Sequence, residues 1–464
     1  MATSDRGTTV TFDVAVIGAG VVGVAVAREL AGYELSVALI DARIDVGDAT
    51  SKANTAILHT GFDAIPGTLE SRLVARGYEL LATYARTANI AVESVGAVLV
   101  AWSDEELQAL PVLLAKAEQN GYHQCELLDA DQVQERIPEL GPGVLGGLLV
   151  PDESIIDPWS TPLAFATDAV LRGAQLQLDT YVHAVDVGEH ETVLHTSRGP
   201  IVARWVVNAA GLGADVLDRM FGFDRFTVTP RRGQLVVFDK LTRSMAPMIV
   251  LPVPSAKGKG VLVAPTIFGN VMLGPTAEDL HDRTDTATTE NGFEFLYDKC
   301  ARIMPRLCEQ DVTATYAGLR AASEHSDYVI ACEEQKRYVL LGGIRSTGLT
   351  ASLAIAEHAV ELLTDAGLAM PPKARAAATV RMPNLGDAAP RPYEDAELIA
   401  QDPAYGEIVC FCERVTRGEL RDAMNSTLPP TELEGLRRRT RACNGRCQGF
   451  YCGAEVRAML RGHT

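Results

Sequence analysis

The stretch that decides the fold is FDVAVIGAGVVG, residues 12–23. It begins as a short β-rich run, turns through glycines, and continues as a helical pattern through Leu30. Gly18 permits the tight turn, Gly20 lets the backbone approach a pyrophosphate, and Gly23 lets the helix pack closely on the strand. This order predicts a dinucleotide-binding fold in which the N-terminus of the helix faces the phosphates.

A second predicted strand, residues 35–40, ends in Asp41. An acidic residue about 20 positions after the glycines is placed to accept hydrogen bonds from a ribose hydroxyl. These features do not distinguish NAD from FAD. The next segment, GDATSKANTAILHTGF over residues 47–62, is small and polar, suits the wrapping of a second diphosphate face, and precedes no further nucleotide fold. It favours FAD.

Two later segments extend this pattern. Residues 205–207 lead as a strand into the small residues 208–211 (NAAG), which let the backbone pass close to a cofactor. Residues 338–341 lead into GGIRSTG, residues 342–348, and then into a predicted helix over 349–365. The sequence therefore aims a second helix N-terminus at an anionic group.

Composition and charge narrow the class of protein. At roughly 100–200 residues per domain, 464 residues suit two or three domains, and 47% hydrophobic with 22% charged residues is typical of a globular chain. With 42 Lys and Arg against 60 Asp and Glu, the net charge of −18 argues against nucleic acid or anionic lipid as a partner. Residues 1–10 carry no signal-peptide pattern, and no apolar run reaches the ~18 residues of a membrane span, so we expect a cytoplasmic protein.

The end of the chain differs from the rest. Residues 371–405 are rich in proline and form a predicted linker, and helices are predicted beyond it at 416–425 and 431–438. Residues 406–464 carry ten Arg, no Lys and seven Asp or Glu, so their charge is +3 and the remainder carries −21. Five of the nine cysteines lie here. In a cytosolic chain, such a group indicates metal binding or redox chemistry more than disulfides.

Several motifs over about residues 10–370 carry a resemblance: GAGVVG, LID, TSKANTAILHTG, RRGQL, KGKGVLVAPT, LGPTAED, AGLRA and the final glycine loop and helix. In this order they resemble the FAD-dependent glycerol-3-phosphate dehydrogenase and L-2-hydroxyglutarate oxidase group of the D-amino-acid-oxidase-like superfamily. The resemblance implies an α/β fold with a Rossmann-type FAD-binding domain from segments of about 10–90, 150–228 and 318–370. An inserted antiparallel-sheet substrate domain would come from about 91–149 and 229–317.

The same resemblance implies which residues hold FAD. Asp41 would hold the adenosine ribose, Thr50, Ser51 and Asn54 the diphosphate region, and Val182 the adenine through its backbone. The loop beginning at 342 would lie against the isoalloxazine, where the helix dipole stabilises negative charge at the N1–C2=O edge. The full predicted cofactor-binding set is Gly18, Gly20, Val22, Gly23, Asp41, Ala42, Thr50, Ser51, Asn54, Val182, Ala210, Gly211, Gly343, Ser346, Thr347, Gly348, Leu349 and Thr350.

Three residues are predicted to act at the substrate. Oxidation of a secondary alcohol needs a group that takes the hydroxyl proton, and His59 suits this role because neutral imidazole works near neutral pH; a hydrogen bond to cofactor or backbone is the alternative. In the resembled group an arginine at the position of Arg320 fixes an anionic substrate group, and an interdomain ion pair is the alternative. Arg345 departs from the Glu-Ser-Pro-Gly stretch of relatives and puts a base beside the flavin. Lys257 and Lys259 add a second anion contact or are simply surface lysines of a hairpin.

The C-terminal motifs CFCERVT, residues 410–416, and RTRACNGRCQGFYC, residues 439–452, resemble the bacterioferritin-associated-ferredoxin-like [2Fe–2S] domain. By this resemblance Cys443 is a nearby thiol and not a ligand. A structural zinc site is the alternative, although CxC is an uncommon zinc spacing. For either metal, the arginines would offset the negative charge of the thiolates. The implied cluster ligands are Cys410, Cys412, Cys447 and Cys452.

Together these features predict an FAD-dependent dehydrogenase that oxidises a small anionic alcohol, glycerol-3-phosphate or a 2-hydroxy acid, by hydride transfer to flavin N5. A cluster that carries single electrons suggests an exit to an acceptor protein or quinone. By analogy, further subunits and peripheral attachment to the inner membrane through a partner are expected. The alternatives are an oxygen-using oxidase or an amine or amino-acid dehydrogenase with a structural cluster, and a non-catalytic redox sensor.

Overall fold

A computed structural model describes residues 11–254, 260–374 and 379–463. Lys257 and Lys259 lie outside these residues. The chain divides into two compact units, each built from separate stretches of sequence. The first comprises residues 1–51, 162–230 and 321–380, and the second comprises residues 52–161, 231–320 and 381–464.

Residues 52–90 and 150–161, expected within the flavin segments, fall in the second unit. Local strand pairing explains their position. Strands β3 (Ile57–Leu58) and β4 (Val92–Ser94) flank β8 (Ser154–Ile156) in a separate three-stranded antiparallel sheet. Strands of two or three residues leave no periodic pattern in the sequence.

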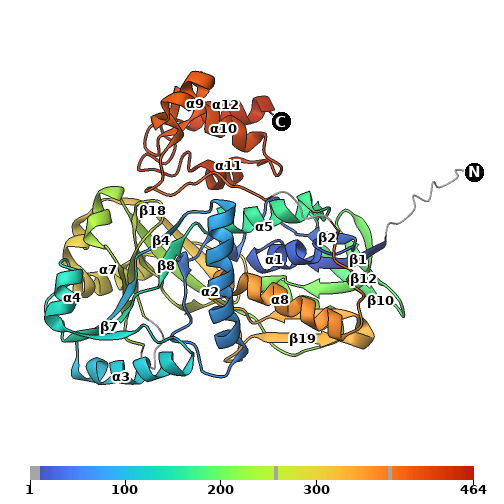
Figure 1. Ribbon diagram of the computed structural model, residues 1–464, viewed down its shortest axis with the longest axis horizontal. Coiled ribbons are helices and arrows are strands. Elements are labelled where there is room, and N and C mark those ends of the chain that lie inside the picture. Colours follow the sequence, from blue (N-terminus) through green and yellow to red (C-terminus); the bar gives the residue numbers. More distant parts are fainter. Residues whose placement is uncertain (1–10, 255–259, 375–378, 464) are drawn as a thin grey trace, which may run out of the picture. The chain divides into compact units, whose positions relative to one another are not determined.

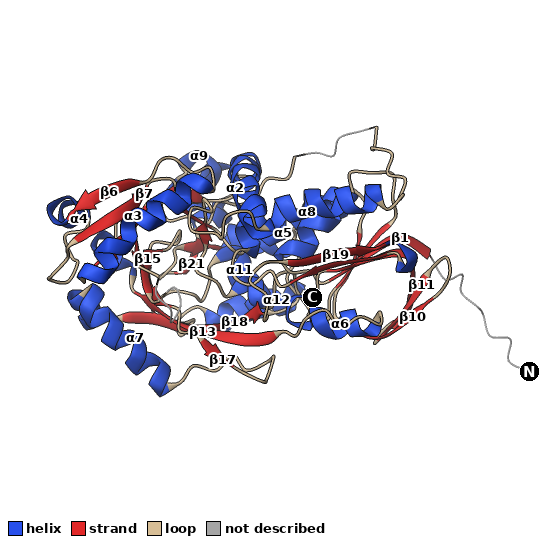
Figure 2. Cartoon of the chain, turned by 90° about the horizontal axis from the view of Figure 1, so that it is seen from below, coloured by secondary structure: helices blue, strands red, loops and turns tan. Residues whose placement is uncertain are grey.

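A largely parallel sheet forms the first unit. Strand β1 (Thr11–Ile17) runs parallel to its neighbours β12 (Gly199–Asn208) and β2 (Val37–Ile40). Farther out, β20 (Tyr338–Gly342) pairs with β12, and β9 (Gln175–Gln177) pairs with β2, again in parallel. Antiparallel strands complete the sheet, with β10 and β11 visible together in Figure 2: β10 (Val182–Val187), β11 (Thr192–Thr196) and β19 (Val329–Glu333).

The helices of this unit follow the strands as the glycine pattern predicts. They are α1 (Val21–Leu30), the larger part of α5 (Ser160–Leu171), α6 (Ala214–Met220) and α8 (Gly348–Asp365). Helix α1 packs against α8, and its alanines and valines are almost all buried. The predicted helix over 349–365 is confirmed to within one residue. The predicted Rossmann-type domain is therefore confirmed.

The turn between β1 and α1 has no space for side chains at two glycines. Gly18 has a φ of +110°, and a Cβ there would lie 2.3 Å from the Ala209 carbonyl oxygen. A Cβ at Gly23 would lie 1.8 Å from the Gly18 carbonyl oxygen. The glycines therefore allow α1 to begin directly at the end of β1, beside the end of β12.

A nine-stranded sheet dominates the second unit, in the order β17, β13, β16, β15, β14, β5, β7, β6, with β18 paired to β13. From β17 to β6 its pairs are antiparallel as predicted, except for the parallel pair β5 and β14. Its strands are β5 (Ala97–Ala101), β6 (Glu126–Asp129), β7 (Gly146–Val150), β13 (Thr229–Phe238), β14 (Ile249–Pro252), β15 (Leu262–Pro265), β16 (Val271–Gly274), β17 (Glu278–Asp279) and β18 (Val312–Ala322).

Helix α7 (Glu290–Ile303) packs on this sheet through Leu296, Cys300 and Ile303, and Figure 2 shows it beside β13. The cysteine is a buried member of the apolar core. The other helices of this part are α2 (Leu69–Ala88), α3 (Asp104–Gln119) and α4 (Ala130–Arg136).

The C-terminal module, residues 406–464, has its own small core, and its elements lie together in Figure 1. Strands β21 (Ile408–Cys410) and β22 (Val415–Thr416) form a hairpin, followed by α10 (Arg417–Met424), α11 (Leu433–Thr440) and α12 (Gly453–His463). The first two helices confirm the prediction with small shifts. Three cysteines, at 410, 443 and 452, belong to the core. The thiols are thus enclosed by the few apolar side chains that the module has.

Two parts of the proline-rich segment make different contacts. In the first unit the Glu34 N–H donates to the Pro371 carbonyl at 2.8 Å. In the second unit Leu385 is buried, and the Asn89 side chain donates to the Met382 carbonyl at 2.9 Å. A short helix, α9 (Ala396–Gln401), precedes the module. The described residues 379–405 therefore have defined contacts and some helical structure.

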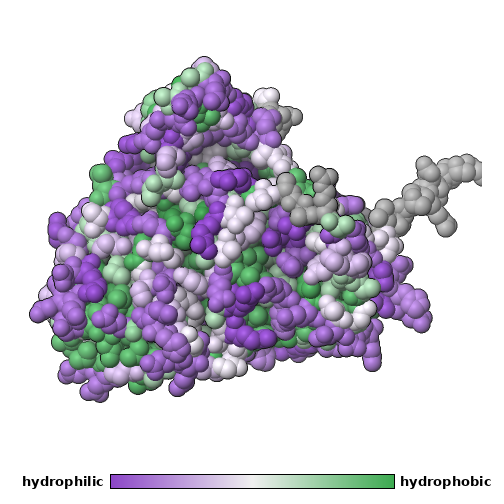
Figure 3. Space-filling view, viewed as in Figure 1, coloured by the Kyte–Doolittle hydropathy of each residue, from purple (hydrophilic) through white to green (hydrophobic). Residues whose placement is uncertain are grey.

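Membrane-spanning segments are not found within the described residues, where no helix has the length and apolar character to cross a bilayer. Figure 3 shows hydrophilic residues spread widely over the visible face, with smaller hydrophobic areas between them.

Candidate functional site

The N-terminus of α1 forms the centre of a dinucleotide site in the first unit. Its N-cap residue is Gly20, which has no side chain to cap the helix. The first turn holds no acidic residue. Ser51 lies beside it, because its Oγ accepts a 2.9 Å hydrogen bond from the Val21 N–H. A positively polarised helix end that follows a glycine turn, with Ser51 beside it, fits a diphosphate.

Asp41 is held at the end of β2 by two backbone donors. Its carboxylate accepts hydrogen bonds from the Ala19 N–H at 2.5 Å and the Arg43 N–H at 2.7 Å. Burial raises the pKa of Asp41, and these two N–H groups partly offset that rise. The Thr180 N–H donates to the Asp41 carbonyl, which brings the chain just before Val182 alongside. The ribose role of Asp41 and the adenine role of Val182 stay predictions.

The remaining predicted flavin residues of this unit lie on the ends of β12 and β20 and the start of α8. Ala210 and Gly211 follow β12 directly. The loop after β20 turns at Gly343 and Arg345, both with positive φ, and α8 begins with no side-chain cap from Thr347 and no acid in its first turn. A second open helix end therefore fits the anionic edge of a flavin.

Asn54, by contrast, belongs to the second unit, where its side chain accepts from the Ala56 N–H at 2.6 Å and its carbonyl from the Tyr316 hydroxyl at 2.9 Å. The predicted diphosphate role of Asn54 stays a prediction.

His59, also in the second unit, is oriented by a buried carboxylate. Its Nδ1 lies 2.9 Å from Glu153 Oε2. The other carboxylate oxygen of Glu153 accepts from the Thr60 N–H at 2.8 Å and the Thr60 hydroxyl at 3.0 Å. Glu153 is fully buried, so this arrangement fixes its position. A Glu153 carboxylate that accepts from Nδ1–H selects the tautomer whose lone pair is on Nε2.

Arg320 has no carboxylate partner among the described residues. It lies on β18, is partly buried, and donates to the Thr276 carbonyl at 2.7 Å. Burial lowers the pKa of Arg320 the most, and the positive charge of the nearby Arg231 lowers it further. The negative charge of Asp279 raises the same pKa and partly opposes them. Arg231 is itself paired with Asp279 at 2.6 Å. A guanidinium stays charged in proteins, so Arg320 offers a positive charge to an anion.

The thiols of the module interact with one another. Cys410 interacts with Cys452, Cys412 interacts with Cys447, and the Cys443 Sγ lies 3.5 Å from the Cys452 Sγ. Among the described residues, no three metal-binding side chains converge on one point. Four predicted thiolate ligands within one small module suit a two-iron cluster.

Backbone N–H groups surround the outermost of these thiols. The Tyr451 N–H, with those of Gly449 and Phe450, lowers the pKa of Cys447, although burial opposes it. Burial raises the pKa of Cys410 and of Cys452 to about 11 in each case. Hydrogen bonds to sulfur are a feature of iron–sulfur sites, so the loop suits a cluster.

Cys443 packs within the same group of thiols. Its Sγ lies 3.5 Å from Cys452 Sγ, and a Cβ at Gly449 would lie 3.2 Å from the Cys443 sulfur. Its φ is +64°, a left-handed conformation that costs a residue other than glycine on the order of 1 to 3 kcal/mol. The tight loop therefore brings the fifth thiol close to the predicted ligands.

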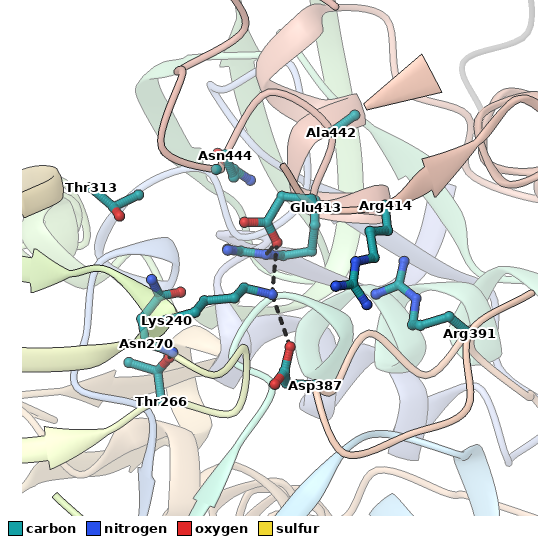
Figure 4. A network of polar contacts seen from close by, with 12 residues as sticks. Lys240, Thr266, Asn270, Thr313, Asp387, Arg391, Glu413, Arg414, Ala442 and Asn444 are labelled. Carbon is teal, nitrogen blue, oxygen red and sulfur yellow. Dashed lines mark hydrogen bonds and ion pairs between the residues drawn. The ribbon is translucent and has the colours of Figure 1, made fainter. Parts of the chain in front are cut away.

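The module contacts the sheet of the second unit through residues next to the predicted ligands. Lys240 lies 2.9 Å from Asp387 and 3.4 Å from the buried Glu413, as the dashed lines in Figure 4 show. Arg446 pairs with Asp239 at 2.7 Å. The sequence did not point to Glu413 or Glu153, because a single glutamate in a loop forms no recognisable pattern. The one signal for Glu413 was its position directly after Cys412.

Comparison with known proteins matches both parts of the chain. The family model described as FAD dependent oxidoreductase matches residues 13–362. This chain belongs to that family. A second model, described as the BFD-like [2Fe-2S] binding domain, matches residues 408–461.

Individual relatives agree. A glycerol 3-phosphate dehydrogenase of Caloramator mitchellensis is 35% identical over 451 residues, which cover 97% of this chain and 94% of the relative. A mitochondrial L-2-hydroxyglutarate dehydrogenase of Arabidopsis thaliana is 29% identical over 398 residues, covering 75% of this chain and 82% of the relative. The structure of dithionite-reduced L-alpha-glycerophosphate oxidase from Mycoplasma pneumoniae with FAD bound aligns with a TM-score of 0.76 and 29% identity, over 81% of this chain and 99% of that one.

The protein is therefore an FAD-dependent oxidoreductase of the glycerol-3-phosphate dehydrogenase and 2-hydroxyglutarate dehydrogenase type, with a C-terminal [2Fe–2S] domain. This confirms the predicted family, fold class and two cofactors. The roles of individual residues stay predictions.

We predict that Cys452→Ser loses the cluster and that Cys443→Gly keeps it. The first change removes a predicted ligand, whereas the second removes a spare thiol and places glycine where φ is +64°. Iron and acid-labile sulfide per chain, with the visible absorbance of the cluster, measure the difference. Equal loss of iron in both variants would instead make Cys443 a ligand.

Proposed function

We propose that this protein is a dehydrogenase that oxidises glycerol-3-phosphate or a 2-hydroxy acid and delivers the electrons to an acceptor protein or quinone. In this proposal FAD accepts a hydride at N5 and the [2Fe–2S] cluster carries single electrons onward. The observation that carries it is Arg320, a partly buried cation without an ion pair among the described residues. A group of this kind suits the phosphate or carboxylate that both substrate types share.

His59 takes the hydroxyl proton of the substrate in this proposal. Its Nδ1 contact with Glu153 supports the role, because a buried carboxylate holds the ring in place and stabilises the imidazolium that forms. Glu153 is thus a positioning residue. The two donors from Thr60 keep its carboxylate directed at the ring.

Within the second unit, a chain of contacts leads from the module to residue 52, where we propose that an electron route begins. The Arg441 guanidinium lies 4.1 Å from the Phe268 ring centre, and the Phe268 ring stacks on Trp159 at 5.0 Å. The Trp159 indole N–H donates to the Lys52 carbonyl at 3.0 Å. Lys52 directly follows Ser51, a predicted flavin residue.

An oxidase with a structural cluster is the second candidate, because the aligned Mycoplasma pneumoniae structure is named an oxidase. The two candidates differ in where the electrons go. An oxidase passes the electrons to oxygen in air. A dehydrogenase with an electron-transfer cluster keeps them until its acceptor binds.

We predict that His59→Ala keeps FAD and slows anaerobic flavin reduction by about 10² to 10⁴-fold, because the proton acceptor is lost. Glu153→Gln slows it by roughly 10 to 100-fold, since the ring remains but is less well held. Stopped-flow absorbance measures both rates. His195→Ala is the matched control, because His195 also contacts a carboxylate, Asp186 at 2.7 Å, but both of these side chains are exposed. An unchanged rate in His59→Ala would exclude the role.

We predict that Arg320→Met raises the KM for glycerol-3-phosphate by about 100-fold or more, because the anionic group loses its charged partner. Uncharged glycerol, a poor substrate for either form, should be affected far less. Arg306→Met serves as control, since Arg306 is exposed and paired with Glu139 at 2.7 Å. The same assay with L-2-hydroxyglutarate, sugar acids and amino acids identifies the substrate. A variant with normal KM for every anionic substrate contradicts the proposal.

The electron route is tested by reducing the holoenzyme anaerobically with substrate. We expect flavin bleaching and then the electron paramagnetic resonance signal of a reduced [2Fe–2S] cluster. Cys412→Ser, which removes a predicted ligand, should keep the bleaching and lose the signal. Rapid reoxidation in air that this variant leaves unchanged would support the oxidase and overturn the dehydrogenase.

A further inference from the structure

Three aromatic side chains of the module are unusually exposed. Phe411, Phe450 and Tyr451 expose 72%, 82% and 76% of their surface. Phe411 lies between Cys410 and Cys412, and the other two lie between Cys447 and Cys452. Neither the core of the module nor the adjoining sheet uses these rings. Large exposed apolar residues that gather at one place mark a site of interaction.

The backbone at the thiols explains this exposure. Cys410 and Cys452 are almost fully buried, at 1% and 2%, so the residues beside them turn outward. The Phe450 and Tyr451 rings contact one another edge to face at 5.1 Å, a preferred aromatic geometry. Phe450 and Tyr451 therefore form a defined apolar pair beside Cys452, and Phe411 is exposed between Cys410 and Cys412 in the sequence.

The size of this surface suits a brief encounter. An aromatic side chain buries roughly 150–250 Å² when covered, so three supply the centre of a small interface. Redox partners typically meet through interfaces below about 1,200 Å². A small interface area with aromatic residues at its centre favours a transient complex with a redox partner.

Charge selects the kind of partner. The module carries +3, whereas the rest of the chain carries −21. Arg414 and Arg457 are both exposed and lie two and five positions from a predicted ligand. An acidic protein is repelled by most of the chain and attracted by the module, which steers it toward the thiols.

We propose that Phe411, Phe450 and Tyr451 form the docking surface for a small acidic protein that carries single electrons. This rests on the proposed exit of electrons through the module. Each encounter transfers one electron from the reduced cluster to the oxidised carrier, without a proton or covalent bond. Two other occupants fit less well. A second copy would bring the same positive module against itself, and an anionic membrane is an extended plane that would also meet the acidic remainder of the chain.

Binding is measured with the full-length holoenzyme and oxidised flavodoxin, a small acidic one-electron carrier, by calorimetry at 50 and 300 mM salt. We expect saturable binding that the higher salt weakens, because exposed charges are screened. The double variant F450S/Y451S should weaken it at least tenfold while cluster absorbance and iron content stay unchanged. Val112→Ser removes an equally apolar side chain, 69% exposed on α3, and should change nothing.

Electron transfer is then followed with enzyme reduced by dithionite, so that the result does not depend on the substrate. Reduction of flavodoxin should slow with F450S/Y451S, whereas reduction of a small acceptor, ferricenium, should not. If the double variant fails to hold its cluster, Phe411→Ser is used in both assays.

Several results would overturn the docking surface. Two of them concern flavodoxin: no binding at all, or equal binding by the variant and the wild-type chain. Loss of dimerisation in the variant, measured by ultracentrifugation, would indicate a second copy as the occupant. Selective loss of binding to phosphatidylglycerol vesicles would indicate a membrane. Failure of the proposed function is recognised separately, because flavin then fails to bleach with any substrate even when flavodoxin binds.

Discussion

The close approach of α1 to β1 is the constraint on which the remaining architecture depends. It requires glycine at two positions, and it brings the N-terminus of a helix to the edge of the parallel sheet where the ends of β2, β12 and β20 also lie. Asp41, the loop after β12 and the second open helix end at α8 are all placed by strands that run parallel to β1. One steric condition thus assembles a cofactor site from residues spread over more than three hundred positions.

Arginine has two different uses in this chain. Arg320 keeps its charge unpaired among the described carboxylates and retains only a carbonyl contact, which leaves it available to an anion. In the module, Arg441 and Arg446 are paired with Glu413 and Asp239, so that their charges hold parts of the protein together. The amino-acid composition does not show which arginines bind an anion and which hold parts of the protein together. The difference lies in whether a carboxylate is within reach, and the fold determines this.

Sequence predicted the features that depend on local pattern. The glycine turn, the long helix at α8 and the two helices of the module follow from short-range rules, and each was found within a few residues. Residues 52–90, predicted within the flavin segments, cluster with the second unit because β3 and β4 pair with β8, which is distant in sequence. Their place in the flavin domain stays a prediction. Glu153 was missed for the same reason. It is 94 positions from His59, and nothing but tertiary structure brings the two together.

The attachment of the module has a consequence for how the protein can change in evolution. Asp239 precedes Arg446 by 207 positions, yet their ion pair acts one peptide bond away from the predicted ligand Cys447. The Gln448 side chain, on the other side of that cysteine, donates to the Thr313 carbonyl at 3.1 Å. A substitution at Asp239 or Thr313 would therefore change contacts of the two residues that flank Cys447. The two domains are joined by a linker but share one set of selective constraints, and they are expected to diverge together.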